Sequence, residues 1–275
     1  MKAKVNKIIP FSNVDGPGNR TSIFLQECNL NCLYCHNPET INICNNCGLC
    51  VPECPVNALT ILNGVVQWDE NKCINCDNCI KICKNNSSPK IKEYTTSEMI
   101  NKILEYKNFI SGVTFSGGEC TLNSKFITEV FKEIRKYGLT CFIDTNGFFD
   151  VEEVFDLIEN TDGFMLDIKA WDNEDHIKLT GKNNFKIKNN LNKLIELDKL
   201  YEVRTVIVPN LLNNEETVKK VSEIIVNTNV RYKIIQFRKN GVRLELINAE
   251  EPSKKYMESL KEIAKKKGVK NIVLT

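Results

Sequence analysis

The sequence predicts an α/β protein, a partial barrel of about six strand–helix units with a cysteine-rich segment inserted near its start. Short apolar strands rich in β-branched residues, each trailed by a helical segment, predict a parallel sheet covered by helices. Eleven of the 13 cysteines fall between Cys28 and Cys83, which marks the insertion. Six units are fewer than the eight of a closed barrel, so an open or partial barrel fits best.

The strands can be placed in order along the chain. The first is expected at residues 21–26, directly before the first cysteines, and regular alternation resumes after about residue 90. The later strands are rich in valine, isoleucine and phenylalanine, as buried parallel strands are. They are expected at 112–116, 139–144, 163–169, 202–208, 232–237 and 271–275.

Capping residues predict where the helices begin and end. Thr95 and Glu98 should form a capping box that opens a helix reaching Ile110. A second helix, over residues 124–137, should stop at Gly138. We further expect Asp150 with Glu153 to cap the third, and Pro252 to lie near the start of the last.

Composition excludes some function classes. The 275 residues carry a formal net charge of +2, which gives no basic field to attract nucleic acid or an anionic membrane. No apolar run is long enough to span a bilayer, and the start "MKAKVNKIIPF" lacks the apolar stretch of a signal peptide. We therefore expect a cytoplasmic protein, in which clustered cysteines indicate metal or cluster ligation rather than disulfides.

The cysteine-rich segment contains two runs, "CNNCGLCVPEC" and "CINCDNCIKIC", each with the spacing C-x2-C-x2-C-x3-C. This is the spacing of bacterial two-cluster ferredoxins, in which the fourth cysteine of each run ligates the other cluster. Asn63-Gly64 predicts a hairpin between the runs, so residues 43–88 resemble a ferredoxin-like domain. The alternative, two zinc sites of four thiolates each, leaves an extra cysteine in each run without a role. The predicted ligands of the two [4Fe–4S] clusters are Cys44, Cys47, Cys50 and Cys83 for one, and Cys73, Cys76, Cys79 and Cys54 for the other.

Three further cysteines stand in "CNLNCLYC", residues 28–35, with the spacing C-x3-C-x2-C. A cluster held by three thiolates leaves one iron with an open position, as catalytic metal sites do. A third structural zinc, or three buried thiols, is the alternative. Other polar groups follow the strands: "SGGE" the second, "DTNG" the third, Asp167 and Lys169 the fourth. Since parallel strands end at one edge, these groups should share one mouth with Cys28.

The motif C-x3-C-x-aromatic-C, with Tyr34 as its aromatic residue, resembles the radical S-adenosylmethionine (SAM) superfamily. The resemblance implies a TIM-like partial (βα)6 barrel formed by residues 1–42 and 89–275. It further implies that Cys28, Cys32 and Cys35 hold a catalytic [4Fe–4S] cluster whose open iron binds SAM. One electron from that cluster then splits SAM into methionine and a 5′-deoxyadenosyl radical.

The same resemblance implies the residues that surround SAM. Gly117 and Gly118, which lack Cβ atoms, should let the backbone approach the ligand closely. The late strand of type members carries a histidine near SAM where Arg238 stands here. His36 should line the adenine pocket or the groove for a protein partner. The residues implied as SAM-binding are Tyr34, His36, Gly117, Gly118, Glu119, Asp144, Thr145, Asp167, Lys169 and Arg204.

The stretch "VDGPGNRTSIF" before the cysteines resembles the signature of glycyl radical enzyme activases, with pyruvate formate-lyase activating enzyme as type member. Activases with a ferredoxin insert are the best match, and "KIIPFSNVDGPG", "CHNPET" and "QFRKNGVR" most resemble the YjjW subgroup. This implies a glycyl radical enzyme as protein substrate, contacted by Asp15, and flavodoxin or ferredoxin as electron donor. Glu27 and Cys120 depart from the usual glycine and proline of the family.

Two other functions fit parts of the pattern. One is a radical SAM enzyme that acts on a small molecule or peptide, which the DGPG-x-R stretch disfavours. The other is a non-catalytic protein that transfers electrons through several clusters, which gains nothing from an open iron. For the insert, electron relay and docking or stabilisation are equally compatible with the sequence. Cys120 and Cys141 are interpreted as buried packing residues, and His176 as structural or surface-exposed.

Overall fold

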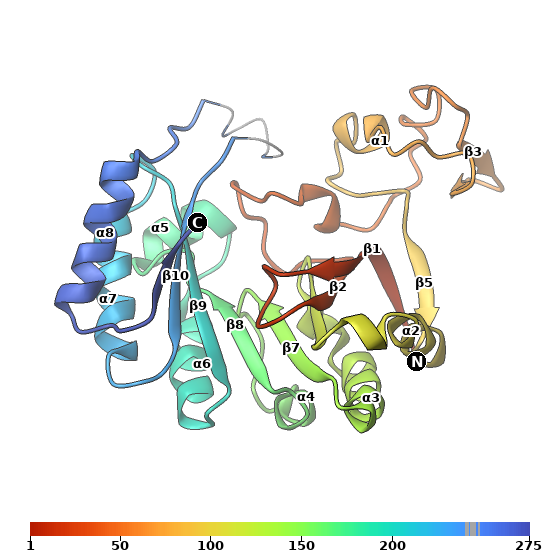
Figure 1. The fold of residues 1–275 in the computed structure, drawn as a ribbon. Helices are drawn as coiled ribbons and strands as arrows, with labels where there is room; N and C mark the ends of the chain where they lie inside the picture. Colours follow the sequence, from red (N-terminus) through yellow and green to blue (C-terminus); the bar gives the residue numbers. More distant parts are fainter. Residues whose placement is uncertain (240–241, 243–245, 247) are drawn as a thin grey trace.

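The computed structural model describes residues 1–239, 242, 246 and 248–275, and within these the chain forms a nine-stranded sheet and a separate two-stranded one (Figure 1). The large sheet has the order β11-β10-β9-β8-β7-β6-β2-β1-β5. Its strands are β1 (Lys2–Ser12), β2 (Arg20–Leu25), β5 (Lys92–Thr95), β6 (Gly112–Gly117), β7 (Thr140–Thr145), β8 (Gly163–Asp167), β9 (Leu200–Ile207), β10 (Arg231–Gln236) and β11 (Ile272–Leu274). The small sheet pairs β3 (Leu59–Leu62) with β4 (Val65–Trp68).

The strands from β2 through β6 to β11 are parallel, which confirms the predicted α/β class. The order is linear, so β5 and β11 remain as edges of an open sheet. β1 and β5 pair antiparallel at one side and were not predicted. In β1, exposed lysines alternate with buried Ala3 and Val5, a period-2 signal that identifies the strand in retrospect.

Helices cover the outer face of the sheet (Figure 1). That face presents fully buried apolar residues such as Val113, Phe115 and Ile143 to Phe131 and Leu157 on the helices. Burial of these side chains is the main favourable contribution to the fold. The helices are α1 (Asn78–Lys81), α2 (Thr96–Leu104), α3 (Ser124–Ile134), α4 (Phe155–Glu159), α5 (Asn173–Thr180), α6 (Phe185–Glu196), α7 (Asn214–Ile225) and α8 (Lys254–Lys266).

The capping box at the start of α2 is confirmed, because the Thr95 hydroxyl accepts from Glu98 N while Glu98 Oε2 accepts from Thr95 N. The helix ends at Leu104 rather than Ile110, and a 3-10 turn over Lys107–Phe109 follows. Gly138 adopts the left-handed conformation, with φ of 76°, after α3 and its terminal 3-10 turn, as predicted.

The predicted cap formed by Asp150 with Glu153 is wrong. Residues 151–154 form turns, and α4 begins only at Phe155. Asp150 instead pairs with Lys186 Nζ at 2.7 Å, which draws its carboxylate away from the helix terminus. At the last helix, Ser253 is the N-cap and accepts from Tyr256 N, so the preceding Pro252 lies just outside the helix.

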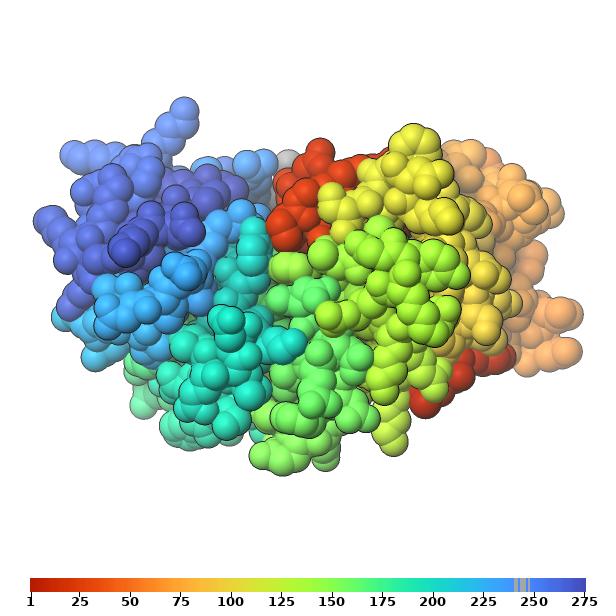
Figure 2. Space-filling view, turned by 60° about the horizontal axis from the view of Figure 1, so that its bottom comes forward, coloured from red at the N-terminus to blue at the C-terminus, as the bar shows by residue number. Residues whose placement is uncertain are grey.

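Residues 43–88, here called the cysteine lobe, project beside the sheet and return to it through β5 (Figure 1). In Figure 2 this orange lobe lies at the opposite end of the molecule from α7 and α8. Asn63 and Gly64 both have positive φ, 51° and 76°, which confirms the hairpin between β3 and β4. The two ends of the lobe meet, since Asn42 N donates to Asn86 O at 3.1 Å.

The domain boundaries at 42/43 and 88/89 stay predictions. No helix in the part of the chain that the structure describes has the length and apolar character needed to cross a bilayer.

Candidate active site

The loop that carries Cys28, Cys32 and Cys35 leaves the C-terminal end of β2 and rests on the last turn of α5. Its backbone N–H groups at Asn31 and Leu33 donate to the carbonyls of Thr180 and Leu179, at 3.0 and 2.9 Å. These carbonyls lie at a helix C-terminus, where the helix itself leaves them unpaired. The helix end therefore fixes the loop at the mouth of the sheet.

The loop cysteines lie in an apolar environment. Cys32 is buried, and Cys28 and Cys35 are half-buried against a cluster that includes Leu30 and Phe237. Burial raises the pKa of the Cys28 thiol to about 12 and that of the Cys35 thiol to about 11. Such thiols become thiolates when a metal replaces the proton.

Asn146 links the cysteine loop to the end of β7. Its Nδ2 approaches Cys28 Sγ at 3.7 Å and donates to Asn29 Oδ1 at 2.8 Å. Asn29 in turn donates to Phe148 O at 2.7 Å. Asn146 is not among the residues predicted to bind SAM, although its position in "DTNG" after a parallel strand was an available signal.

Glu119 joins the ends of β6 and β7. Its buried carboxylate accepts hydrogen bonds from the Thr121 and Thr145 hydroxyls, at 2.6 and 2.7 Å, and from the Asn146 backbone N at 2.8 Å. Burial raises the pKa of Glu119, and these donors oppose the rise. The structure thus brings Glu119 and Thr145 together, and their hydrogen bond connects the ends of β6 and β7 at the mouth.

A charged group lies on the inner face of the sheet, the face that carries Arg20, Ser22 and Arg204. Arg204 Nη1 pairs with Asp144 Oδ1 at 3.0 Å, and its Nε pairs with Glu202 Oε1 at 2.5 Å. Burial raises the pKa of Asp144 to about 6, against the opposing effect of Arg204. Burial lowers the pKa of Arg204, but Asp144 and Glu202 outweigh burial and raise it.

A second charged pair follows β8. Lys169 Nζ lies 2.8 Å from Asp167 Oδ2 and 5.5 Å from the centre of the Tyr34 ring. Burial lowers the pKa of Lys169, but Asp167 and Tyr34 outweigh it and hold that pKa well above its usual range. An ammonium therefore persists beside the cysteine loop at neutral pH.

Gly117 and Gly118 are crowded by the backbone of a neighbouring segment. A Cβ on Gly117 would lie 2.2 Å from Leu25 O, and one on Gly118 would lie 2.2 Å from Glu27 O. The backbone at the end of β2 and just after it thus requires glycine at both positions, and their predicted approach to SAM stays a prediction. Gly118 N and Glu119 N also donate to Leu25 O and Glu27 O, which locks the two strand ends together.

We expect Gly118→Ala to destabilise the protein by on the order of 3 kcal/mol, because backbone atoms cannot move aside as side chains can. Thermal unfolding should shift down by roughly 10 °C. Gly138→Ala is the matched control: it is left-handed but has no atom within 4 Å of the added carbon, so it should cost about 1 kcal/mol. Equal shifts for the two variants would contradict the crowding argument.

Asp15 reaches the inner face from the loop between β1 and β2. Its Oδ2 accepts from the Ser12 and Ser22 hydroxyls at 2.6 and 2.8 Å, and its carbonyl accepts from Thr114 Oγ1 at 2.6 Å. Arg20 is fully buried below it and donates to neutral oxygens, including Thr140 O at 2.9 Å. The "DGPG-x-R" stretch therefore packs against the inner face of the sheet.

Two histidines and one arginine complete the predicted set. His36 is exposed, with its ring centre 6.1 Å from that of Phe237 after β10. Arg238 follows directly and is exposed. His176 is buried, with Nδ1 2.7 Å from Lys182 O. Of the two predicted alternatives, structural or surface-exposed, its position agrees with the structural one.

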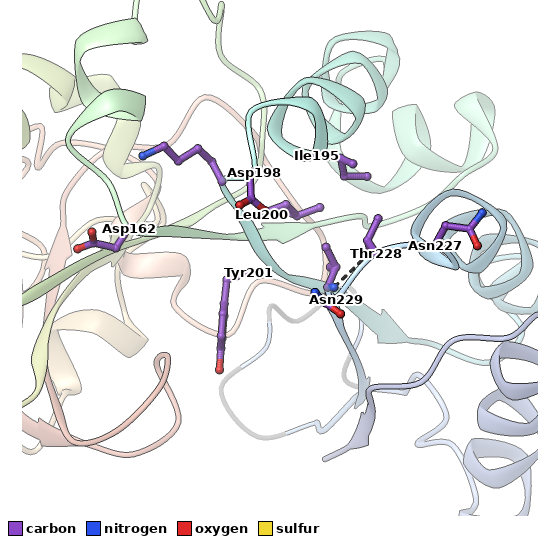
Figure 3. A pocket seen from close by; sticks show the side chains of 10 residues that line it. Asp162, Ile195, Asp198, Leu200, Tyr201, Asn227, Thr228 and Asn229 are labelled. Carbon is purple, nitrogen blue, oxygen red and sulfur yellow. Dashed lines mark hydrogen bonds between the residues drawn. The ribbon is translucent and has the colours of Figure 1, made fainter.

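A cleft lies on the side of the sheet where β8, β9 and β10 begin, opposite to the cysteine loop. Figure 3 shows this cleft of about 470 Å³, lined by Asp162, Asp198, Tyr201 and Asn229 among others. Most of its lining residues stand just before β8, β9 or β10, or at the start of β9. In α/β sheets the sites lie at the opposite, C-terminal ends of the strands, where the cysteine loop stands.

The sequence matches the radical SAM superfamily over residues 22–225. The chain belongs to that superfamily. A Haemophilus influenzae protein described as a glycyl-radical enzyme activating enzyme is 32% identical, over 98% of this chain and 95% of its own length. The pyruvate formate-lyase-activating enzyme of Staphylococcus epidermidis is 31% identical, over 88% and 84%. This radical SAM enzyme is thus homologous to glycyl-radical enzyme activating enzymes.

Solved structures agree on the fold of this radical SAM enzyme. QueE from Escherichia coli aligns with 100% of this chain and 94% of its own, with a TM-score of 0.58 and 12% identity. A domain of pyruvate-formate lyase-activating enzyme from Bacteroides vulgatus aligns with 60% of this chain and 99% of its own, with a TM-score of 0.52 and 21% identity. At these identities the likeness concerns the fold alone.

Membership of the radical SAM superfamily implies a [4Fe–4S] cluster and SAM. The residues at the mouth fit both groups. Three thiols on one loop are ligands that iron–sulfur clusters take, and the Asn146 amide lies within reach of one of them. The Lys169 ammonium and the Asp144–Arg204 pair are charged groups of the kinds that recognise the carboxylate and ammonium of an amino acid.

Proposed function

We propose that this radical SAM enzyme activates a glycyl radical enzyme by removing one Cα hydrogen from a glycine of that partner. The observation that carries the proposal is the similarity, along nearly the whole chain, to a glycyl-radical enzyme activating enzyme. When bound, the cluster and SAM supply a 5′-deoxyadenosyl radical for the abstraction. The remaining roles belong to the protein's own residues.

The cysteine loop and the strand ends would position these groups. Cys28, Cys32 and Cys35 are the proposed iron ligands, on a loop fixed by Thr180 and Leu179. Lys169 lies beside that loop, 5.5 Å from the ring centre of the loop's own Tyr34. The proposed SAM contacts also include Asp144 and Arg204, whose buried pairing keeps both side chains in fixed orientation.

Asp15 is the proposed contact for the partner. Support comes from its place on the inner face, where Ser12 and Ser22 orient the carboxylate. The negative charge of Asp15 also acts on Asp144, because it contributes to the raised pKa of that carboxyl. A polypeptide loop that enters the open barrel would meet Asp15 beside the SAM site.

We also propose that the cysteine lobe holds two further [4Fe–4S] clusters. Two pockets support this. Cys44, Cys47, Cys50 and Cys83 all line one pocket, and Cys54, Cys73, Cys76 and Cys79 all line the other. Each pocket therefore contains three cysteines of one run and the fourth of the other, in agreement with the cross-ligation that the spacing predicts, and the first pocket is also lined by Cys79.

The two cysteine runs also share a backbone conformation. Asn46 and Asn75 stand at equivalent positions and both have positive φ, 59° and 54°, as do Gly48 and Asp77 two residues later. In the described residues, no group of three or more His, Cys, Asp or Glu side chains is close enough to hold a single metal ion. Sulfurs spread around a pocket suit a four-iron cluster better than one zinc ion.

The activase proposal is tested by mixing the anaerobically reconstituted, reduced enzyme with SAM and glycyl radical enzymes of its own organism. We expect a glycyl radical signal by electron paramagnetic resonance (EPR) in one partner, and its absence when the partner's radical-site glycine is replaced by alanine. Iron analysis of the same samples should give about twelve irons per chain for three clusters. Flavodoxin and ferredoxin, the proposed electron donors, can replace the chemical reductant in the same assay.

Other outcomes would overturn the proposal. Cleavage of SAM without a radical in any partner would favour a small molecule or peptide as substrate. Absence of SAM cleavage from fully loaded protein, with or without partners, would favour a protein that only transfers electrons.

A further inference from the structure

Trp68, at the end of β4, lies against one of the two cysteine pockets. It lines the pocket that also contains Cys54, Cys73, Cys76 and Cys79. It packs on the small apolar core of the lobe, formed by Cys50, Leu59 and Val66. The Trp68 ring therefore belongs to the wall of this pocket.

The indole nitrogen of Trp68 has no hydrogen-bond partner. Nε1 is shielded from solvent, and none of the described residues accepts its hydrogen. A buried N–H without an acceptor is unfavourable, so such groups are rare unless a ligand or ion completes them. Since indole nitrogen can only donate, the missing partner must be an acceptor.

Two of the other polar groups of this pocket already have partners. Lys90 Nζ lies 2.5 Å from Asp77 Oδ1, and Cys54 Sγ accepts from Ala58 N at 3.2 Å. Lys92 lies outside the ring plane, 5.9 Å from its centre, and is not an acceptor. The acceptors that line this pocket are the sulfurs of the four cysteines and the side-chain oxygens of Asp77 and Asn78, and none of them accepts the Trp68 hydrogen. Sulfide in a cluster held by the four cysteines would add further acceptors at the centre of the pocket.

We propose that Trp68 Nε1 donates a hydrogen bond to a sulfur of the [4Fe–4S] cluster held by Cys54, Cys73, Cys76 and Cys79, and so raises its reduction potential. The proposal rests on the clusters assigned to the lobe under the proposed function. Donation to sulfur stabilises the negative charge added when the cluster takes up one electron from an external donor, with no bond made or broken.

The two pockets therefore differ in the side chains that can donate a hydrogen bond to a cluster. The pocket of Cys44, Cys47, Cys50 and Cys83 is also lined by Ser87, whose hydroxyl lies 3.4 Å from Cys83 Sγ. It contains no tryptophan. An electron that enters the lobe should accordingly rest on the cluster beside Trp68.

The direct test uses ¹⁵N-indole labelling of the reconstituted, electrochemically reduced enzyme and pulsed EPR. The chain has two tryptophans, Trp68 and Trp171, so the matched control is available. We expect weak coupling between the reduced cluster spin and the labelled nitrogen in the wild type. The coupling should persist in Trp171→Phe and vanish in Trp68→Phe.

A redox titration supplies the second readout. Trp68→Phe should lower the reduction potential of one lobe cluster by about 59 mV, which is a tenfold change in the equilibrium constant of a one-electron couple. The potential of the other lobe cluster should stay unchanged. Full iron content with neither nitrogen coupling nor a shift would overturn the proposal for Trp68. Iron for a single cluster in the wild type would instead overturn the lobe clusters themselves, which separates the two failures.

Discussion

Replacing Cys32 with alanine is expected to abolish reductive cleavage of SAM. Cys32 is the middle one of the three proposed ligands and is 7% exposed, so a ligand from solvent cannot easily replace it. Mutating a residue that only supports a metal ligand lowers metal affinity or activity by up to about 100-fold. Losing a ligand itself should lower SAM cleavage by more. The measurement is 5′-deoxyadenosine released by the anaerobic, reduced, reconstituted enzyme.

Cys141→Ala is the matched control for this experiment. Cys141 is also a buried cysteine, but it lies on β7 toward the apolar core, away from the cysteine loop. Its loss should leave SAM cleavage near the wild-type rate. Full activity of the Cys32 variant would contradict the assignment of the loop, and equal loss in both variants would indicate general damage rather than a missing ligand.

Arg204→Met is expected to cause the largest loss of stability. The variant leaves the carboxylates of Asp144 and Glu202 buried and without the guanidinium that holds both. Removing one partner of a buried ion pair costs about 3–5 kcal/mol, because the remaining charge loses its compensation. Thermal unfolding of the loaded enzyme should therefore shift down by roughly 10 °C.

Arg204→Lys separates charge from geometry. Lysine keeps the positive charge but lacks the planar fork that reaches Asp144 with Nη1 and Glu202 with Nε at once. We expect about half the loss seen for methionine. An unchanged unfolding temperature in Arg204→Met would show that Arg231, which also contacts Glu202, suffices to hold the group together.

The parallel part of the fold could be predicted because its strands are buried on both faces and end in polar motifs. β1 and the edge strand β5 were missed because exposed lysine and glutamate residues weaken the apolar signal of both strands. The start of α4 was misplaced because Asp150 found a better partner in Lys186, a contact between residues 36 apart that no local pattern contains.

At the site, residue types were easier to predict than their partners. The sequence placed Glu119 near the ligand, but only the folded chain shows its carboxylate engaged with Thr121, Thr145 and Asn146. The glycine pair was recognised by motif, whereas its crowding by Leu25 and Glu27 depends on how two strand ends meet. Such contacts are set by tertiary packing, which spacing along the chain does not encode.

The cysteine lobe leaves and re-enters the barrel at a single point. Asn42 donates to Asn86 O through its backbone and to Asn85 O through its side chain, and Asn85 donates back to Ile43 O at 2.8 Å. A shortcut joining these residues would require no movement of the strands. The lobe is therefore attached in such a way that its removal would leave the two flanking segments already side by side.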